Sequence, residues 1–395
     1  MDEVLVNANQ IENSPHSTTT VLRKTGLPFS IDPMLTRFQS PDSLRNDKGN
    51  TKQNYKRLVA MYGRGTDVQF GSGPLVDLVR SEASWRLIAR NVIDYQWNRL
   101  VEEPTQLDLF SLEQNLELRP ARVIAPALMA ASPAEDHVNQ LLAEASAEVA
   151  QASFAVPVIV PLRRLLQRRS LDSLLNNLPT DRVNSYLVWT PGVSEATLLA
   201  DPKILTQLLR LTAALARRGV PVAHLHGGYA IGALHGLGIS AMAHHLGWVD
   251  NGDPIETGRG GLRSCRTYVP GLRRTATFEN ARELGGSLDD RTYAERYCEC
   301  SFCTGAFENG QHPLDLLLED QFVHFGDGGG RRTPTGRAIG ANTWHYLLSR
   351  RLEVQRFSLM LSTEVIEEDI DRAAALAGMN ATYGLRRLAA ELKAA

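Results

Sequence analysis

Short apolar segments alternate with segments of helical composition through the middle of the chain. The apolar segments lack the strict polar alternation of a sheet with one solvated face, and they lie at 122–129, 156–160, 183–189, 220–225 and 239–243. Helix-start signals stand between them, as at Ser132 and Pro133, which precede two acidic residues. Strands that are apolar on both faces and joined by helices are typical of a parallel sheet covered on both sides. The pattern predicts an α/β fold.

The number of strand–helix units favours a barrel over an open sheet. A further strand end is indicated by the segment 29–33, and a further helix by the segment 75–97. With the central segments, these bring the count close to that of a (β/α)8 TIM barrel. We therefore expect a (β/α)8 barrel over residues 21–255.

The two ends of the chain have a different character. Residues 1–20 are polar and rich in Asn, Ser and Thr, so we expect them to be disordered. Residues 256–395 open with Gly and Arg, contain the cysteines, and close with helical segments at 341–362 and 364–393. We expect this last region to form a zinc-binding subdomain with C-terminal helices.

Composition and charge restrict the class of protein. The chain has 395 residues, of which 43% are hydrophobic and 22% are charged, and this balance allows a sizeable core. The net charge of −2 provides no overall attraction to nucleic acid or to an anionic membrane. No apolar run approaches the length of a membrane span, and the N-terminus lacks the apolar core of a secretory signal. We therefore expect a cytoplasmic protein with no membrane partner.

Three of the four cysteines lie within six residues, in the sequence Cys298-Glu-Cys300-Ser-Phe-Cys303. A disulfide framework needs spread pairs and an oxidising compartment, whereas a tight cluster in a cytoplasmic protein is typical of a metal site. Zinc takes four ligands in a tetrahedron, so the cluster predicts structural Zn²⁺ with one further ligand. The candidates for that ligand are His312, His324, His345 and Cys265. An iron–sulfur cluster is the competing hypothesis, with Cys265 as its fourth thiolate.

Two histidines alternate at the end of a predicted strand. His224 and His226 are separated by one residue and followed by Gly227 and Gly228, so both side chains face the same way beside a flexible turn. In a barrel, the groups that contact substrate lie at the carboxyl ends of the strands. The pattern indicates a substrate-binding site, with a hydrogen-bonded pair of core histidines as the alternative.

Other candidates lie where further strands are expected to end. Asp32 precedes Pro33, and the segment after the last predicted strand supplies His244, Asp250 and Asp253. Carboxylates suit a nucleophile and a stabiliser of a positively charged transition state, as in glycoside cleavage. An ordinary turn is the alternative for these aspartates. A catalytic metal site is a further hypothesis, with the ligands His224, His226, His244 and Asp250.

Arginines gather on both sides of the cysteines, in contrast with the overall charge of −2. They are Arg259, Arg263, Arg266, Arg273, Arg274, Arg331, Arg332 and Arg337. Such a patch would bind phosphate groups and place a nucleic acid over the barrel mouth, with the target base flipped out of its stack. A solvated charged loop is the alternative for each arginine taken alone.

The cysteine motif, together with Thr343-Trp344-His345 at the start of a predicted helix, resembles the zinc subdomain of the tRNA-guanine transglycosylase superfamily. The resemblance implies that His345 is the fourth zinc ligand. Thr257-Gly-Arg259-Gly260-Gly261 is similar to the Thr-Arg-x-Gly-x-x-Gly loop that follows the last barrel strand of the family, which implies that Arg259 binds substrate. The gap between Cys303 and His345 is longer than in the family, so we expect an insertion within 305–340.

The resemblance, which covers residues 200–360, also implies a function. Members of the superfamily exchange a guanine base in tRNA, and a divergent branch modifies DNA with 7-deazaguanines. A carboxylate attacks the nucleoside in this reaction. The place of the family's nucleophile holds Ala243 or His244 in this chain, so Asp250 and Asp253 become the candidates for that role. Asp32 is the nearest equivalent of the family's second catalytic aspartate.

The sequence therefore predicts a glycosyltransferase that exchanges a guanine or 7-deazaguanine base in DNA or tRNA. The expected catalytic residues are Asp32, Asp250 and Asp253, and the expected substrate-binding residues are His224, His226, Gly227, Gly228, His244 and Arg259. Family members commonly pair through the zinc subdomain, so the resemblance makes a homodimer an option. The alternatives are a barrel that binds nucleic acid or a protein partner without chemistry, and a metal-dependent hydrolase.

Overall fold

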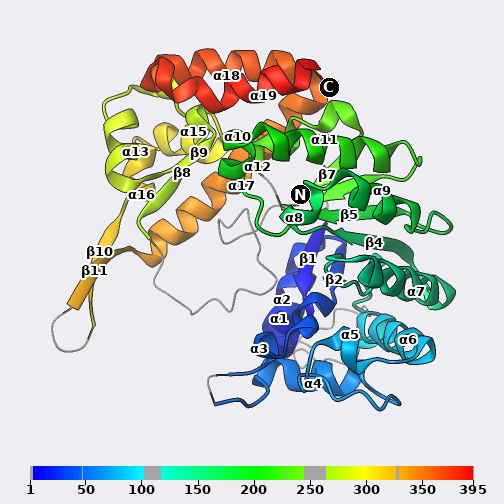
Figure 1. The fold of residues 1–395 in the computed structure, drawn as a ribbon. Helices are drawn as coiled ribbons and strands as arrows, with labels where there is room; N and C mark the ends of the chain where they lie inside the picture. The colour runs from blue at the N-terminus through cyan, green and yellow to red at the C-terminus, as the bar shows by residue number, and fades with distance from the viewer. Residues whose placement is uncertain are drawn as a thin grey trace. The chain divides into compact units, whose positions relative to one another are not determined.

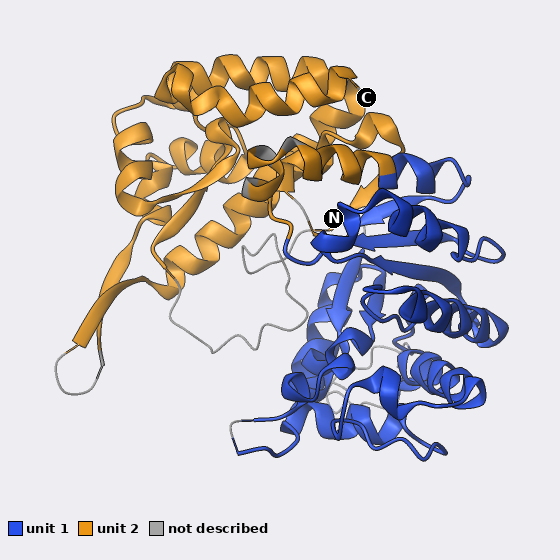
Figure 2. Ribbon diagram, viewed as in Figure 1, with its two compact units in different colours: residues 1–192, 211–224, 252–257 blue, residues 193–210, 225–251, 258–395 orange. Residues whose placement is uncertain are grey.

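A computed structural model describes residues 3–46, 48–101, 117–226, 228–243, 264–325 and 329–394. These residues divide into two compact units, which Figure 2 colours separately. The first unit contains the described residues of 1–192 and 211–224, and the second contains those of 193–210, 225–243 and 264–394. The second unit therefore draws on segments that precede the boundary we expected at residue 255.

Seven strands form one sheet, and strands that follow one another in sequence are neighbours in space (Figure 1). The strands are β1 (Val4–Asn7), β2 (Phe29–Asp32), β3 (Arg122–Ile124), β4 (Ser153–Ile159), β5 (Ser185–Trp189), β6 (Val222–His224) and β7 (Ile239–Met242). The pairs from β1 to β6 are all parallel. The predicted α/β fold with a parallel sheet is confirmed.

The strand order is that of a barrel wall. A doubly wound sheet reverses direction at a switch point, whereas this order runs from β1 to β7 without reversal. The sheet is a curled half-barrel. Among the described residues it has no eighth strand and no pairing of β7 with β1, so a closed (β/α)8 barrel remains a prediction.

Helices join the strands of the first unit. They are α1 (Ala8–Asn13), α2 (Pro15–Thr25), α3 (Pro41–Leu44), α4 (Gln53–Tyr62), α5 (Leu75–Leu78), α6 (Glu82–Asn98), α7 (Pro133–Val149), α8 (Leu162–Leu165) and α9 (Arg168–Asn176). The expected helix at 75–97 is in fact two helices. Ser81 is extended and its side chain accepts a hydrogen bond from the Ser84 backbone N–H, which makes it the N-cap of a new helix.

The prediction of a disordered N-terminus was wrong for residues 3–20. These residues form β1, α1 and the first part of α2. Ala8 and Ile11 of α1 are fully buried, and the Glu12 carboxylate accepts hydrogen bonds from Tyr95 at 2.8 Å and Arg99 at 2.7 Å. A few apolar residues and one buried ion pair therefore anchor a segment whose average composition is polar.

The core of the first unit includes a cluster of aromatic rings. The Phe38 ring lies 5.5 Å from that of Tyr62, which meets the Tyr95 ring edge to face at 5.5 Å. The near-continuous burial of β4 places the sheet in the interior, as the apolar pattern predicts.

The second unit is mainly helical. Its helices are α10 (Glu195–Ala200), α12 (Gly228–Gly232), α13 (Phe278–Gly285), α14 (Asp290–Arg296), α15 (Ser301–Glu308), α16 (Pro313–Leu317), α17 (Gly336–Leu359), α18 (Ser362–Ala377) and α19 (Tyr383–Ala394). The helix α11 (Pro202–Ala216) has residues in both units. Two antiparallel ribbons complete the unit: β8 (Arg266–Val269) with β9 (Arg274–Thr277), and β10 (Asp320–Phe325) with β11 (Gly329–Pro334).

The two predicted C-terminal helices are present with different limits. The first begins early, at Gly336, because the Thr335 side chain caps it through the Ala338 backbone N–H at 3.2 Å. The expected helix at 364–393 is divided into α18 and α19 at Gly378, which has φ of 78°. A left-handed backbone of this kind favours glycine and ends the helix. None of the described helices combines the length and the apolarity needed to cross a bilayer.

The short strand β3 is completed by a side chain. The pairing of β2 with β3 covers only Ser30 and Arg122. The buried Gln96 amide bonds both backbone groups of Ile124: it accepts from the N–H at 2.8 Å and donates to the carbonyl at 2.7 Å. Gln96 thus occupies the place of a strand neighbour.

We expect Gln96→Leu to lower the free energy of unfolding by about 2 to 4 kcal/mol, because it leaves two buried backbone groups without partners. Urea unfolding would measure the change. Gln140→Leu is the matched control, since among the described residues the Gln140 amide bonds the side chain of Glu144 and no backbone group, and we expect it to change stability by about 0.5 kcal/mol or less. Equal effects of the two substitutions would contradict the role given to Gln96.

Candidate metal centre and strand-end residues

Three cysteines and one histidine converge in the interior of the second unit. The thiols of Cys298, Cys300 and Cys303 and a ring nitrogen of His345 all lie within 4.8 Å of one another, and all four residues are buried. The His345 Nδ1 atom is 3.9, 3.5 and 3.4 Å from the three sulfurs in sequence order. This group can hold a metal ion.

Local structure brings the three thiols together. Cys300 is the N-cap of α15, so Cys303 lies in the first turn of that helix while Cys298 stands just before it. The Cys300 backbone N–H points at the Cys298 sulfur at 3.4 Å. The fourth residue, His345, comes from the middle of α17.

The orientation of the His345 ring suits a metal ligand. Its Nε2 atom lies 3.0 Å from the backbone carbonyl oxygen of Tyr268, which can only accept a hydrogen bond. Nε2 therefore carries the proton, and the lone pair of Nδ1 faces the sulfurs. A backbone carbonyl that fixes the tautomer of a ligating histidine is a common feature of metal sites.

The thiols themselves indicate that a cation belongs among them. Burial raises the pKa of Cys303 well above its usual range, and the neighbouring Cys298 and Cys300 raise it further. For Cys298, burial acts in the same direction, but hydrogen bonds from Cys300 and Cys303 outweigh it and lower the pKa. A divalent ion would stabilise all three as thiolates.

The other candidates for the fourth ligand lie elsewhere. The His312 Nδ1 atom accepts a hydrogen bond from the Leu314 backbone N–H at 3.2 Å and so caps α16. His324 lies on β10, with its ring 4.8 Å from that of Phe322. Cys265 is half-buried ahead of β8 and does not join the group. His345 thus occupies the place that an iron–sulfur cluster would need for a fourth thiolate.

Asp32 is the last residue of β2. Its carboxylate accepts a hydrogen bond from the Met34 backbone N–H at 2.8 Å, and Met34 has a left-handed backbone with φ of 56°. Burial raises the pKa of Asp32, while the Met34 hydrogen bond and the charge of Arg37 partly oppose the rise. A carboxyl group in such surroundings keeps its proton to a higher pH than usual and can donate it.

His224 is placed as a core residue. It is buried at the end of β6, and its Nε2 atom is hydrogen-bonded to the Thr212 hydroxyl of α11 at 3.1 Å. Burial lowers its pKa to about 3, so the ring is neutral. This placement favours the alternative of a hydrogen-bonded core histidine. His226 is half-buried, and Gly228 opens α12.

Several predicted site residues lie outside the described part of the chain. They are Gly227, His244, Asp250, Asp253 and Arg259. Their assignment remains a prediction from sequence.

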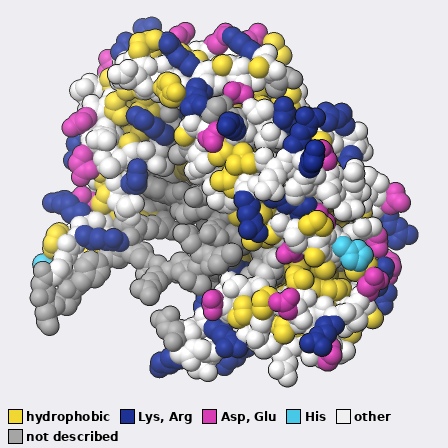
Figure 3. Space-filling view, viewed as in Figure 1, with side chains coloured by type: hydrophobic (Ala, Val, Ile, Leu, Met, Phe, Trp, Pro, Cys, Tyr) yellow, Lys and Arg dark blue, Asp and Glu magenta, His cyan; other side chains and the backbone are white. Residues whose placement is uncertain are grey.

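The structure removes Arg273 from the predicted basic patch, and Arg259 and Arg263 lie outside the described residues. Arg273 is buried and paired with Glu353 and Asp369, so it is not available to a phosphate group. Arg332 is exposed on β11 and pairs with Asp320. On the face shown in Figure 3, basic side chains are spread among acidic ones.

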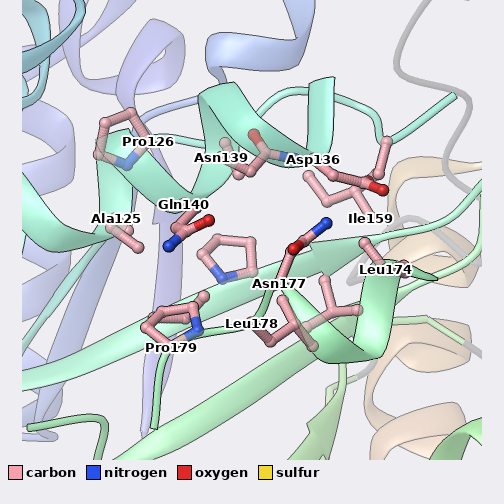
Figure 4. Close-up of a pocket in the computed structure, with 16 residues that line it drawn as sticks. Ala125, Pro126, Asp136, Asn139, Gln140, Ile159, Leu174, Asn177, Leu178 and Pro179 are labelled. Atoms are coloured by element: carbon pink, nitrogen blue, oxygen red, sulfur yellow. The ribbon is translucent and has the colours of Figure 1, made fainter. Parts of the chain in front are cut away.

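A small cavity lies in the first unit beside β4, between α7 and α9 (Figure 4). Its volume is about 10 Å³, which is room for one water molecule. Asn139 and Asn177 supply polar groups to its wall. The cavity is too small to bind a substrate.

Sequence reasoning missed a buried ionic network in the second unit. Its charged members are Glu195, Arg273, Arg350, Glu353, Arg356 and Asp369. These residues form no motif, because they come from segments far apart in the chain. One signal was present: Arg350 and Glu353 lie three residues apart on α17, the spacing at which oppositely charged side chains on a helix can pair.

We expect Cys300→Ser or His345→Gln to reduce bound metal from about one ion per chain to a small fraction, because three ligands hold a structural ion poorly. Elemental analysis would measure this, and reconstitution with Co²⁺ would report the thiolate ligands by their charge-transfer absorption. Cys265→Ser is the matched control and should keep the full metal content. Retention of metal by the first two variants would rule out this ligand set.

The pH dependence of stability should reflect His224. Its folded pKa of about 3 lies below the ordinary value of 6.5, so the unfolded chain takes up the proton first as the pH falls. This stability is fully present above pH 6.5 and is lost between pH 6.5 and about 3. At pH 5 the loss is about 2 kcal/mol relative to pH 7.

Urea unfolding at pH 7 and at pH 5 would measure this loss. We expect the free energy of unfolding of His224→Gln to fall by about 2 kcal/mol less between the two pH values than that of the wild-type chain. His137→Gln is the control, because it makes the same substitution at an exposed histidine. An unaltered pH dependence in His224→Gln would show that the ring is not neutral in the fold.

Comparison with known proteins adds no family to this description. No protein-family model matches the chain, and no curated protein is similar to it.

Proposed function

We propose that this chain is a zinc protein of the tRNA-guanine transglycosylase type, which exchanges a guanine or 7-deazaguanine base in nucleic acid. The observation that carries the proposal is the convergence of Cys298, Cys300 and Cys303 with His345. That histidine is the one implied by the resemblance, through the sequence Thr343-Trp344-His345, and the other candidates lie elsewhere.

The donor set supports zinc as the metal. Three thiolates and one imidazole in a tetrahedron are a common arrangement at structural zinc sites. With all four positions filled by protein, zinc stabilises the fold and takes no part in bond breaking. Reduced thiols also suit a cytoplasmic protein.

The strand order supports a barrel-type active site. Parallel neighbours β1 to β6 bring their carboxyl ends to one edge of the sheet, where barrel enzymes hold their substrates. Asp32 ends β2 at this edge. We assign the closed (β/α)8 barrel as part of the same proposal.

The reaction needs a nucleophile and a proton donor. A carboxylate attacks the anomeric carbon, the bond from that carbon to the base breaks, and the departing base takes up a proton. Asp32, whose pKa is raised by burial, suits the proton donor. We assign the nucleophile to Asp250 or Asp253. The incoming base then displaces the carboxylate, so the nucleic acid chain stays intact.

His224 weighs against the metal-dependent hydrolase. Its ring is buried and hydrogen-bonded to the Thr212 hydroxyl, and among the described residues it joins no group of side chains that could hold a metal ion. A barrel that binds nucleic acid without catalysing a reaction is the alternative, and an assay of base incorporation distinguishes it from a transglycosylase.

Incorporation of labelled guanine and 7-deazaguanine into DNA and tRNA tests the proposal with the full chain. We expect Asp32→Asn to slow incorporation by about a hundredfold or more, which is the range for loss of a general acid. Asp42→Asn is the control, since Asp42 is an exposed carboxylate ten residues away in sequence and should have no effect.

Asp250→Asn and Asp253→Asn identify the nucleophile, because loss of the correct carboxylate abolishes the covalent adduct with the nucleic acid. If the wild-type chain binds nucleic acid but incorporates neither base, the transglycosylase proposal fails and the binding function replaces it. Full activity in all three variants would show that the carboxylates are assigned wrongly.

A further inference from the structure

The buried ionic network of the second unit begins at the metal centre. His345 donates from Nε2 to the Tyr268 carbonyl at 3.0 Å, and the Tyr268 hydroxyl donates to Glu353 at 2.7 Å. The Arg350 guanidinium lies 4.4 Å from the centre of the Tyr268 ring and bonds Glu353 at 2.7 Å. The metal ligand and the network thus share both α17 and Tyr268.

The network reaches α12 through Glu195. One carboxylate oxygen of Glu195 accepts from Arg350 at 2.9 Å, and the other accepts from the Tyr229 backbone N–H at 3.1 Å. Tyr229 is the second residue of α12, the helix that follows β6. One acidic side chain therefore connects the helix of the metal ligand with the start of α12.

The Tyr229 side chain is held by the same network. Its hydroxyl donates to Asp369, and the Arg273 guanidinium lies 5.0 Å from the centre of its ring. Arg273 also bonds Glu353 at 2.8 Å, which closes a loop of contacts back to α17. The backbone and the side chain of Tyr229 are fixed by different members of one set.

Gly228 shows how closely α12 approaches this set. A Cβ atom at this position would lie 2.1 Å from a Glu195 carboxylate oxygen and 2.6 Å from an Arg350 nitrogen. Only glycine fits there without moving the ion pair. Gly228 is thus required by packing against the network, whatever ligand the segment binds.

The choice of charged residues in this interior is informative. A buried ion pair stabilises a fold little better than apolar side chains of similar size, but its directional bonds permit fewer arrangements. Arginine, with five donors in a fixed fork, holds two acidic partners at defined angles. The network is suited to setting the position of α12 with precision.

We propose that Glu195 and Arg350 are positioning residues, which transmit the geometry of the metal-centre helix α17 to Gly228 and Tyr229 at the start of α12. The evidence for coupling between α17 and α12 is the set of contacts described above within the second unit. The role of α12 in holding the exchanged base rests on the proposed function.

Hydrogen exchange of the metal-loaded full chain, read by mass spectrometry, tests the coupling without an activity assay. In Arg350→Met, we expect the Tyr229 amide and the rest of α12 to exchange about tenfold faster or more, because the Glu195 carboxylate that accepts from the Tyr229 N–H loses the Arg350 guanidinium that holds it. Removal of metal from the wild-type chain by a chelator should accelerate the same amides. Lys393→Met is the control, because Lys393 pairs with Glu367 at the surface of the same unit and should leave α12 unchanged.

Glu195→Ala provides a second variant, in which the chelator should add little to an exchange rate that is already raised. Gly228→Ala approaches the same contact from α12 and should also accelerate exchange there. Unchanged protection of α12 in a folded, metal-loaded Arg350→Met or Gly228→Ala would overturn the proposal. So would a chelator effect on α17 that does not reach α12 in the wild-type chain.

The activity assay separates this inference from the proposed function. If base exchange is present, Arg350→Met should raise KM for the incoming base more than it lowers kcat, because the residue places a binding element and touches no reacting atom. If base exchange is absent, the proposed function fails, while the exchange rates of α12 still decide the coupling.

Discussion

The placement of buried charge is the constraint on which the second unit depends. Three thiols and an imidazole meet where water is excluded, and only a cation allows the thiols to ionise together. A few residues further along α17, Arg350 and Glu353 neutralise each other and their neighbours in the same interior. Ion pairs and hydrogen bonds depend more strongly on direction and distance than apolar contacts do. The buried charges therefore determine which segments lie next to each other.

The first unit also contains buried ion pairs between its helices. Glu12 of α1 pairs with Arg99, the C-cap of α6, and Asp136 of α7 pairs with Arg164 of α8. Each pair lies between helices that flank the sheet. Because the strands themselves are apolar and tolerate small shifts, the ion pairs and the Gln96 amide supply the directional contacts that a hydrophobic interior lacks.

Periodic and local features could be predicted from the sequence. The parallel strands β3 to β6 follow from apolar segments, and the Cys298 cluster follows from spacing. His345 could be chosen only through the resemblance, since nothing in its neighbours distinguishes it from His312 until α17 is folded. The order at residues 3–20 was missed because averaged composition hides two buried anchors, Ala8 and Ile11. The role of Glu195 was missed because its partners are remote in sequence.

The unbroken strand order has a consequence for how the chain assembles. Each strand from β2 to β6 pairs with the strand that precedes it in the sequence. The strands are therefore synthesised in the order in which they lie in the sheet. A sheet whose order reverses must leave an edge open for a strand that arrives later. The metal centre is completed later, because Cys303 precedes its partner His345 by 42 residues in the sequence. During synthesis the sheet can thus grow strand by strand, whereas the ligand set of the metal centre is complete only once His345 has been made.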